Sequence, residues 1–151
     1  MDSRVFDTSY VTVSEEAIGA HFLVSARSPL ASQKSVTVEE LLEQPFLLTE
    51  KGMSYRRLME EKLAARSLEV RPVLETARAD LICSLVAADM GISFLPDYVT
   101  EEAVRKGLAA RLLVPDFQVE VWKQLLYRRD KWLSAPMEAV IKHLSAIRLQ
   151  A

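Results

Sequence analysis

Two short segments carry hydroxyl and cationic side chains of the kind that bind a small anion. The first runs from Thr49 to Arg56, where an apolar run ends and a helical pattern begins. Such a strand-to-helix corner presents unpaired N–H groups and a partial positive charge, which suit a carboxylate or a phosphate. Its candidate ligand-binding residues are Thr49, Gly52, Ser54, Tyr55 and Arg56. A second corner, Thr76-Ala77-Arg78, has the same layout and contributes Thr76 and Ala77 as candidates.

Each corner also has a structural interpretation. Ser54 is a good N-cap residue for the helix that follows it. The arginines of that helix can pair with Glu60 and Glu61 one turn further on. Thr76 is an ordinary N-cap candidate for the next helix. The sequence alone leaves ligand binding and helix capping open at both corners.

The chain has no recognisable catalytic or metal-binding motif. It lacks a Gly-rich phosphate loop, a Cys-x-x-Cys pair and a His-Glu-x-x-His sequence. We interpret His21 and His143 as structural or surface histidines, because both fall in segments with an apolar pattern. Cys83 lies among the apolar residues of a helical pattern, where a small buried hydrophobe is the ordinary interpretation. We therefore expect no enzymatic activity, no catalytic residue, no metal and no cofactor.

The composition is typical of one globular domain. The chain has 151 residues, of which 50% are hydrophobic and 26% charged, with a formal net charge of −2. A nucleic-acid-binding module normally carries a strongly basic face, which this balance does not provide. No apolar run is long enough to span a membrane, and Met1-Asp2-Ser3-Arg4 lacks the pattern of a signal peptide. A single cysteine favours a reducing compartment, so we expect a cytoplasmic protein without a membrane partner.

Short apolar runs alternate with helical patterns along the chain. We expect strands over residues 21–26, 46–48, 69–75, 92–95, 108–114 and 119–127, and helices over 38–42, 54–65, 77–89, 97–106 and 134–149. Thr37 and Glu40 have the spacing of a capping box, and Pro72 indicates that its strand lies at an edge or begins late. Strands separated by helices predict an α/β fold with a mostly parallel sheet and flanking helices.

The order and spacing of several motifs resemble the effector-binding domain of LysR-type transcriptional regulators. The most specific segment is Leu85-Val86-Ala87-Ala88, followed after two residues by Gly91-Ile92-Ser93-Phe94-Leu95-Pro96. The shorter matches are Ser28-Pro29-Leu30-Ala31, Val38 with Leu41, Pro45-Phe46-Leu47-Leu48, Gly107-Leu108 and Ser134-Ala135-Pro136. Together they cover the chain from about residue 15 to residue 147.

This resemblance implies a two-lobed fold of the periplasmic-binding-protein type 2 class, with a small effector between the lobes. Residues 17–117 would form the second lobe, residues 1–16 the end of the first lobe and its crossover, and residues 118–151 the returning strand and C-terminal helix of that incomplete first lobe. The chain would then be a piece of a longer regulator or a truncated product, and DNA binding would require a helix-turn-helix domain that this chain lacks. The resemblance places the loop from Thr49 to Ser54, and Thr76 with Ala77, on the side of the second lobe that faces the effector.

Three functions follow as hypotheses. The leading hypothesis is an effector-sensing regulatory domain that binds a small anionic or polar metabolite. The alternatives on the same fold are a solute-binding protein and a stand-alone interaction module. We also expect a homodimer, because Trp122, Leu125 and Leu126 need cover if part of the first lobe is missing.

Overall fold

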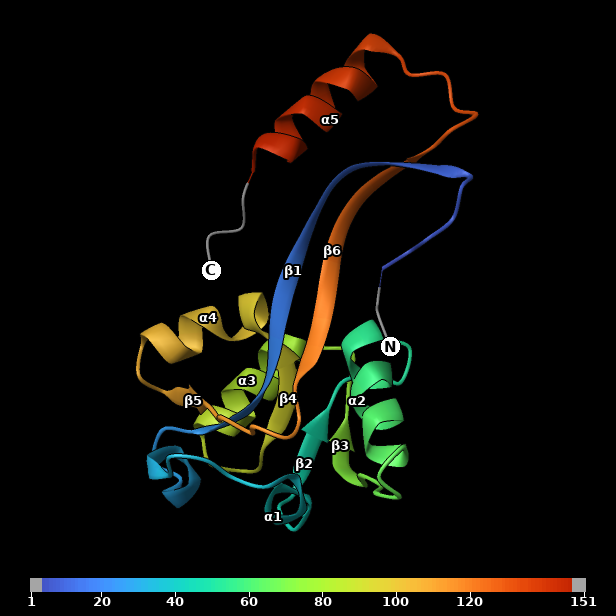
Figure 1. The fold of residues 1–151 in the computed structure, drawn as a ribbon. Helices are drawn as coiled ribbons and strands as arrows, with labels where there is room; N and C mark the ends of the chain where they lie inside the picture. The colour runs from blue at the N-terminus through green and yellow to red at the C-terminus, as the bar shows by residue number, and fades with distance from the viewer. Residues whose placement is uncertain (1–3, 148–151) are drawn as a thin grey trace.

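A computed structural model describes residues 4–147 (Figure 1). The strands are β1 (Tyr10–Ser25), β2 (Phe46–Leu48), β3 (Pro72–Glu75), β4 (Ser93–Pro96), β5 (Ala109–Arg111) and β6 (Val119–Arg128). The α-helices are α1 (Val38–Leu42), α2 (Ser54–Ala64), α3 (Ala79–Ala87), α4 (Asp97–Arg105) and α5 (Ala135–Ala146), and Pro29–Ser32 is a 3-10 helix. Every expected element is present. The end of the predicted last helix, residues 148–149, lies outside the described residues.

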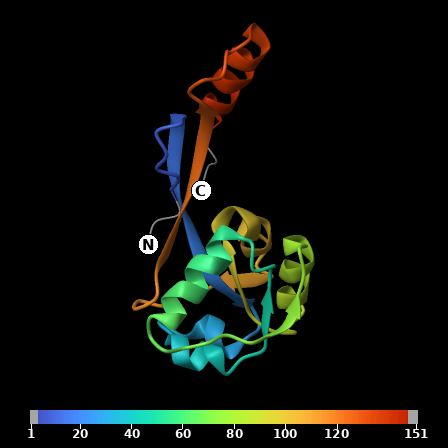
Figure 2. The same cartoon turned by 90° about the vertical axis from the view of Figure 1, so that its right-hand side faces the viewer.

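The strand β1 is much longer than the apolar run that predicted it. It begins at Tyr10, and most of its length forms an antiparallel ladder with β6 that runs from Tyr10 opposite Arg128 to Ala20 opposite Val119. This two-stranded arm projects out of the body of the molecule, as both ribbon views show (Figures 1 and 2). The sequence predicted β6 but missed the first part of β1, because that part mixes apolar and charged residues and only the buried end of β1 has an apolar run.

The body contains five strands in the spatial order β3-β2-β4-β1-β5. β2 and β3 pair in parallel, and a parallel bridge from Phe46 to Ile92 joins β2 to the start of β4. β1 pairs antiparallel with both β4 and β5. Four strands of the body therefore run in one direction, as expected, but β1 runs against them. The sheet is therefore mostly parallel by strand direction, and the ladders that include β1 are antiparallel.

Helices cover both faces of this sheet. α2 lies on one face, and α3 and α4 lie on the other (Figures 1 and 2). Side chains alternate across a strand, so the paired residues Phe22 and Phe94 share one face while His21 and Leu95 share the opposite face. β3 is an edge strand that begins at Pro72, as the proline predicted.

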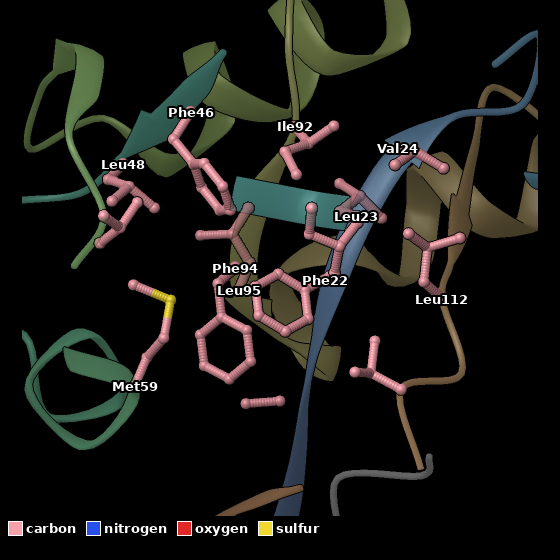
Figure 3. Close-up of a cluster of buried hydrophobic side chains, with 14 of the residues drawn as sticks. Phe22, Leu23, Val24, Phe46, Leu48, Met59, Ile92, Phe94, Leu95 and Leu112 are labelled. Carbon is pink, nitrogen blue, oxygen red and sulfur yellow. The ribbon is translucent and has the colours of Figure 1, made fainter. Parts of the chain in front are cut away.

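The core between the sheet and α2 is built around Phe22. Its ring centroid lies 5.0 Å from that of Phe94, 5.3 Å from that of Phe117 and 6.2 Å from that of Phe46. Met59 of α2 points toward the same cluster (Figure 3) and is fully buried. Aromatic rings at these separations add specific edge contacts to the free energy gained by burying apolar surface.

The helix α5 lies at the far end of the arm (Figure 1) and contacts β1 and β6. None of its described residues is buried, and Val140, Leu144 and the adjoining Ile147 remain substantially exposed. Among residues 4–147, no helix combines the length and apolarity that crossing a bilayer requires.

Candidate functional site

Both predicted corners lie at one edge of the body. Thr49 follows β2, Thr76 follows β3 and Asp97 follows β4. Because these three strands run in the same direction, their carboxyl ends meet at the same edge of the sheet. That edge faces the side from which the arm leaves the body (Figure 1). Open α/β sheets bind small ligands beyond the carboxyl ends of their strands.

The Thr49 hydroxyl is buried without a hydrogen-bond partner of normal geometry among the described residues. The residue is 1% exposed. The neighbouring Tyr55 is also buried, and this burial raises the pKa of its phenol, while an interaction with the Thr49 side chain works against that rise. A buried hydroxyl that makes no hydrogen bond of normal geometry costs free energy, so its presence at this edge is compatible with a further polar group that binds from outside the chain.

The helix α2 begins beside Thr49 with an open N-terminus. Its N-cap residue is Met53, and no side chain accepts from the first N–H groups, so the predicted capping role of Ser54 is wrong. Its first turn contains no acidic residue, whereas each of the other four α-helices in the described part of the chain has at least one. The positive end of the helix dipole at α2 is therefore not neutralised by the protein itself.

Arg56 is used within the protein. The side chain is 1% exposed, and Nη1 donates to the carbonyl oxygen of Thr49 and to Glu75 Oε2, the latter over 2.8 Å. Nε donates to Glu60 Oε1 over 3.0 Å. The predicted pairing with Glu60 is confirmed, and so is the corresponding contact between Arg57 and Glu61. Arg56 thus acts on this edge by fixing the backbone of Thr49.

The remaining candidates lie on the open side of the same edge. Gly52 is exposed, and a Cβ atom built there would meet no other atom within 4 Å. Thr76 Oγ1 accepts from the N–H of Arg78 over 3.2 Å, but the N-cap residue of α3 is Arg78, so Thr76 is not the cap. Ala77 is exposed beside it.

A charged cluster at this edge escaped the sequence analysis. His21 Nδ1 of β1 lies 2.6 Å from Asp97 Oδ1 at the first residue of α4. Arg111 Nε of β5 lies 3.3 Å from the same oxygen atom and 2.9 Å from Thr100 Oγ1. The His21 side chain is therefore 44% exposed and hydrogen-bonded to Asp97, which agrees with the interpretation as a structural or surface histidine. The position of Asp97 directly after a buried strand was the signal that pointed to it.

The described residues contain no group of three or more histidine, cysteine, aspartate or glutamate residues that could hold a metal ion. The Cys83 thiol contacts the carbonyl oxygen of Val99 over 3.8 Å, and burial raises its pKa. A raised pKa keeps the thiol protonated and therefore a weak nucleophile.

The fold is that of an α/β domain whose candidate ligand-binding residues lie at the carboxyl ends of its strands. The chain belongs to the LysR substrate-binding domain family, whose model matches residues 20–147. The uncharacterized HTH-type transcriptional regulator YwqM of Bacillus subtilis is 33% identical over 115 residues, which are 75% of this chain and 38% of YwqM. The HTH-type transcriptional activator CmpR of Synechocystis sp. is 26% identical over 124 residues, which are 82% of this chain and 41% of CmpR. This chain thus spans about two fifths of the length of these relatives.

Solved structures share the fold. The regulatory domain of CcmR from Synechocystis PCC6803, in complex with 2-PG, superposes with a TM-score of 0.76 at 19% identity, covering 95% of this chain and 70% of that domain. The effector-binding domain of QuiR, in complex with shikimate, also superposes with a TM-score of 0.76, at 15% identity, over 95% of this chain and 67% of that domain. The expected periplasmic-binding-protein-like α/β fold is therefore confirmed.

Proposed function

We propose that this chain is the effector-sensing part of a LysR-type transcriptional regulator. Its effector would be a small anionic or polar metabolite bound at the carboxyl edge of the body. The regulator would bind DNA through a helix-turn-helix domain outside this chain and would act in the cytoplasm without enzymatic activity. Family membership supports this class, since the curated relatives that match are regulators of transcription.

One observation carries the proposed site. The buried Thr49 hydroxyl, whose contact with the Tyr55 phenol does not reach normal hydrogen-bond geometry, lies beside α2. This helix is the one α-helix of the described chain that has neither a capping side chain nor an acid in its first turn. We infer that the N–H groups of Ser54 and Tyr55, with the Thr49 hydroxyl beside them, would bind one carboxylate. Two structures with this fold contain the small molecules 2-PG and shikimate, and shikimate is a carboxylate with several hydroxyl groups.

We propose the same division of the chain that the resemblance implies. Residues 17–117 would be the second lobe, with residues 1–16 and 118–151 belonging to the crossover and the first lobe. The continuous strand β1 supports this division, because it passes from the arm into the body near Ala20, where the ladder with β6 ends. The arm and α5 would then be the part of the first lobe that this chain contributes.

The chain would also pair with a second copy through α5. Its apolar residues Val140, Leu144 and Ile147 are 56%, 44% and 47% exposed. A two-stranded arm with one helix offers little apolar surface to cover them. We expect light scattering at micromolar concentration to give the mass of a dimer, and a monomeric mass would contradict the pairing. Val140→Glu should dissociate the dimer, whereas Leu113→Glu, at an equally exposed apolar residue of the body, should not.

Calorimetric titration with shikimate and other small carboxylates tests the site. Ser54→Asp places a negative charge at the N-terminus of α2 and should weaken binding of a carboxylate by about ten-fold or more. Ser54→Asn introduces a side chain of nearly the same shape as aspartate but without its charge. Its affinity for the carboxylate should stay within about three-fold of the wild-type affinity. The proposal fails if none of the carboxylates binds, or if both variants bind a responding carboxylate equally well.

A further inference from the structure

The two strands of the arm are attached to the body in different ways. β1 passes from the arm into the body without a break and pairs there with β4 and β5. β6 reaches the body through residues 112–118, which connect it to β5 and belong to neither strand. An arm attached at β1 alone would be free to pivot about that strand, because a short segment outside the sheet absorbs changes of direction. The way in which residues 112–118 are held therefore matters for the direction of the arm.

The last three residues of this segment are each held by α2 or by the core beneath it. Asp116 Oδ2 accepts from Arg66 Nη2 over 2.7 Å. The ring of Phe117 is buried and belongs to the aromatic cluster of the core. The carbonyl oxygen of Gln118 accepts from Lys62 Nζ, which also lies 5.3 Å from the centroid of the Phe117 ring. Two cations thus hold the residues on both sides of a buried ring.

Both cations belong to a well-supported part of the body. Lys62 lies in the last turn of α2, which ends at Ala64, and Arg66 follows in the turn after the helix. Arg66 Nη2 also lies 3.2 Å from Glu39 Oε1 of α1. Near its other end, α2 is fixed to the carboxyl ends of β2 and β3 through the buried Arg56. The helix therefore offers a rigid support to the segment that leads into β6.

We propose that Lys62 and Arg66 form a latch that sets the direction in which the arm leaves the body. The latch is the second point of attachment, beside β1, and it keeps the arm from pivoting. Under the proposed division of the chain, β1 and β6 are the two connections between the lobes, so the latch would set the angle between them. The latch itself does not depend on the proposed effector site or on any ligand.

Hydrogen exchange measures how firmly the latch holds. Lys62→Met and Arg66→Met keep long apolar stems without the charge, and each should raise exchange of the amides of residues 115–120 about two- to five-fold. Exchange of the β4 amides should stay within about two-fold of the wild type. Lys106→Met removes an exposed pair with Glu102 on α4 and should change neither region. Wild-type exchange at residues 115–120 in both latch variants, or an equal rise in β4, would overturn the proposal.

A distance between the arm and the body shows whether the latch sets a direction. Spin labels at Glu43→Cys, on the exposed end of α1, and at Lys131→Cys, just beyond β6, report this distance in a Cys83→Ser background. Dilution with unlabelled protein ensures that the distance is measured within one chain. We expect one narrow distribution with the latch intact, and a broadened or shifted one when Lys62→Met and Arg66→Met are combined. A distribution that the double variant leaves unchanged, or one that is already broad with the latch intact, would show that the latch does not position the arm.

Discussion

The guanidinium of Arg56 donates a hydrogen bond from Nη1 to the backbone carbonyl oxygen of Thr49. The same atom contacts Glu75 at the end of β3, so one buried cation fixes the carboxyl ends of two neighbouring strands. This contact explains why a charged residue lies buried in α2. It also means that the position of the Thr49 side chain depends on Arg56.

Removing this cation should destabilise the whole body. We expect Arg56→Ala to lower the free energy of unfolding by about 3 kcal/mol, because it leaves a buried carbonyl and two carboxylates without their partner. Arg57→Ala removes an exposed pair on the same helix and should cost no more than about 0.5 kcal/mol. Urea unfolding of both variants measures the difference. Equal losses of unfolding free energy would show that the buried contacts of Arg56 stabilise the protein no more than the exposed pair of Arg57.

Removing the unpartnered hydroxyl should have the opposite effect on stability. Thr49→Val has the same shape, and we expect the ligand-free variant to be as stable as the wild type or up to about 1 kcal/mol more stable. Thr100 is equally buried, but its hydroxyl donates to the carbonyl oxygen of Asp97 and accepts from Arg111. Thr100→Val should therefore lose about 1–2 kcal/mol in the same urea experiment. A large loss in Thr49→Val would reveal an internal partner for that hydroxyl and remove the main support for the site.

The aromatic cluster should dominate the stability of the core. Phe22→Ala removes the ring that contacts Phe46, Phe94 and Phe117, and we expect a loss of about 4 kcal/mol in the free energy of unfolding. Trp132→Ala removes a larger ring that is 80% exposed, so its effect should stay within about 0.5 kcal/mol. Thermal or urea unfolding of both variants measures the two losses of stability. Similar losses would mean that ring size rather than burial determines the cost.

Acid should weaken the start of α1. The backbone N–H of Thr37, followed by its hydroxyl, donates to Glu40 and holds the pKa of that carboxyl below its usual value. A carboxylate with a lowered folded-state pKa contributes stability above its unfolded pKa and loses that contribution as the pH falls through the folded value. The urea midpoint of the wild type should therefore fall between about pH 5 and pH 3, and Glu40→Gln should reduce this dependence. Glu43→Gln, at the other end of α1, serves as the control and should leave the slope unchanged.

Local features of the fold were predictable because neighbouring residues produce them. The capping box of Thr37 and Glu40 is present, and so are the strand after Pro45 and the late start of β3 at Pro72. The N-cap of α2 was predicted wrongly, since Ser54 fits the local preference but the chain places Met53 there. The local preference for serine at the N-cap does not decide the cap of α2, because the loop that follows β2 sets the residue at which the helix begins.

The sequence by itself determined where most of the elements lie, the class of the fold and the segments that meet at its edge, because periodicity, turn residues and caps act over a few positions. Only the tertiary structure decided the direction and length of β1, the pairing of Arg56 with Glu75, and the meeting of His21 with Asp97 and Arg111. These contacts join residues far apart in the chain. An alternating strand pattern specifies which face is buried, but it does not specify which distant strand or charge will lie opposite.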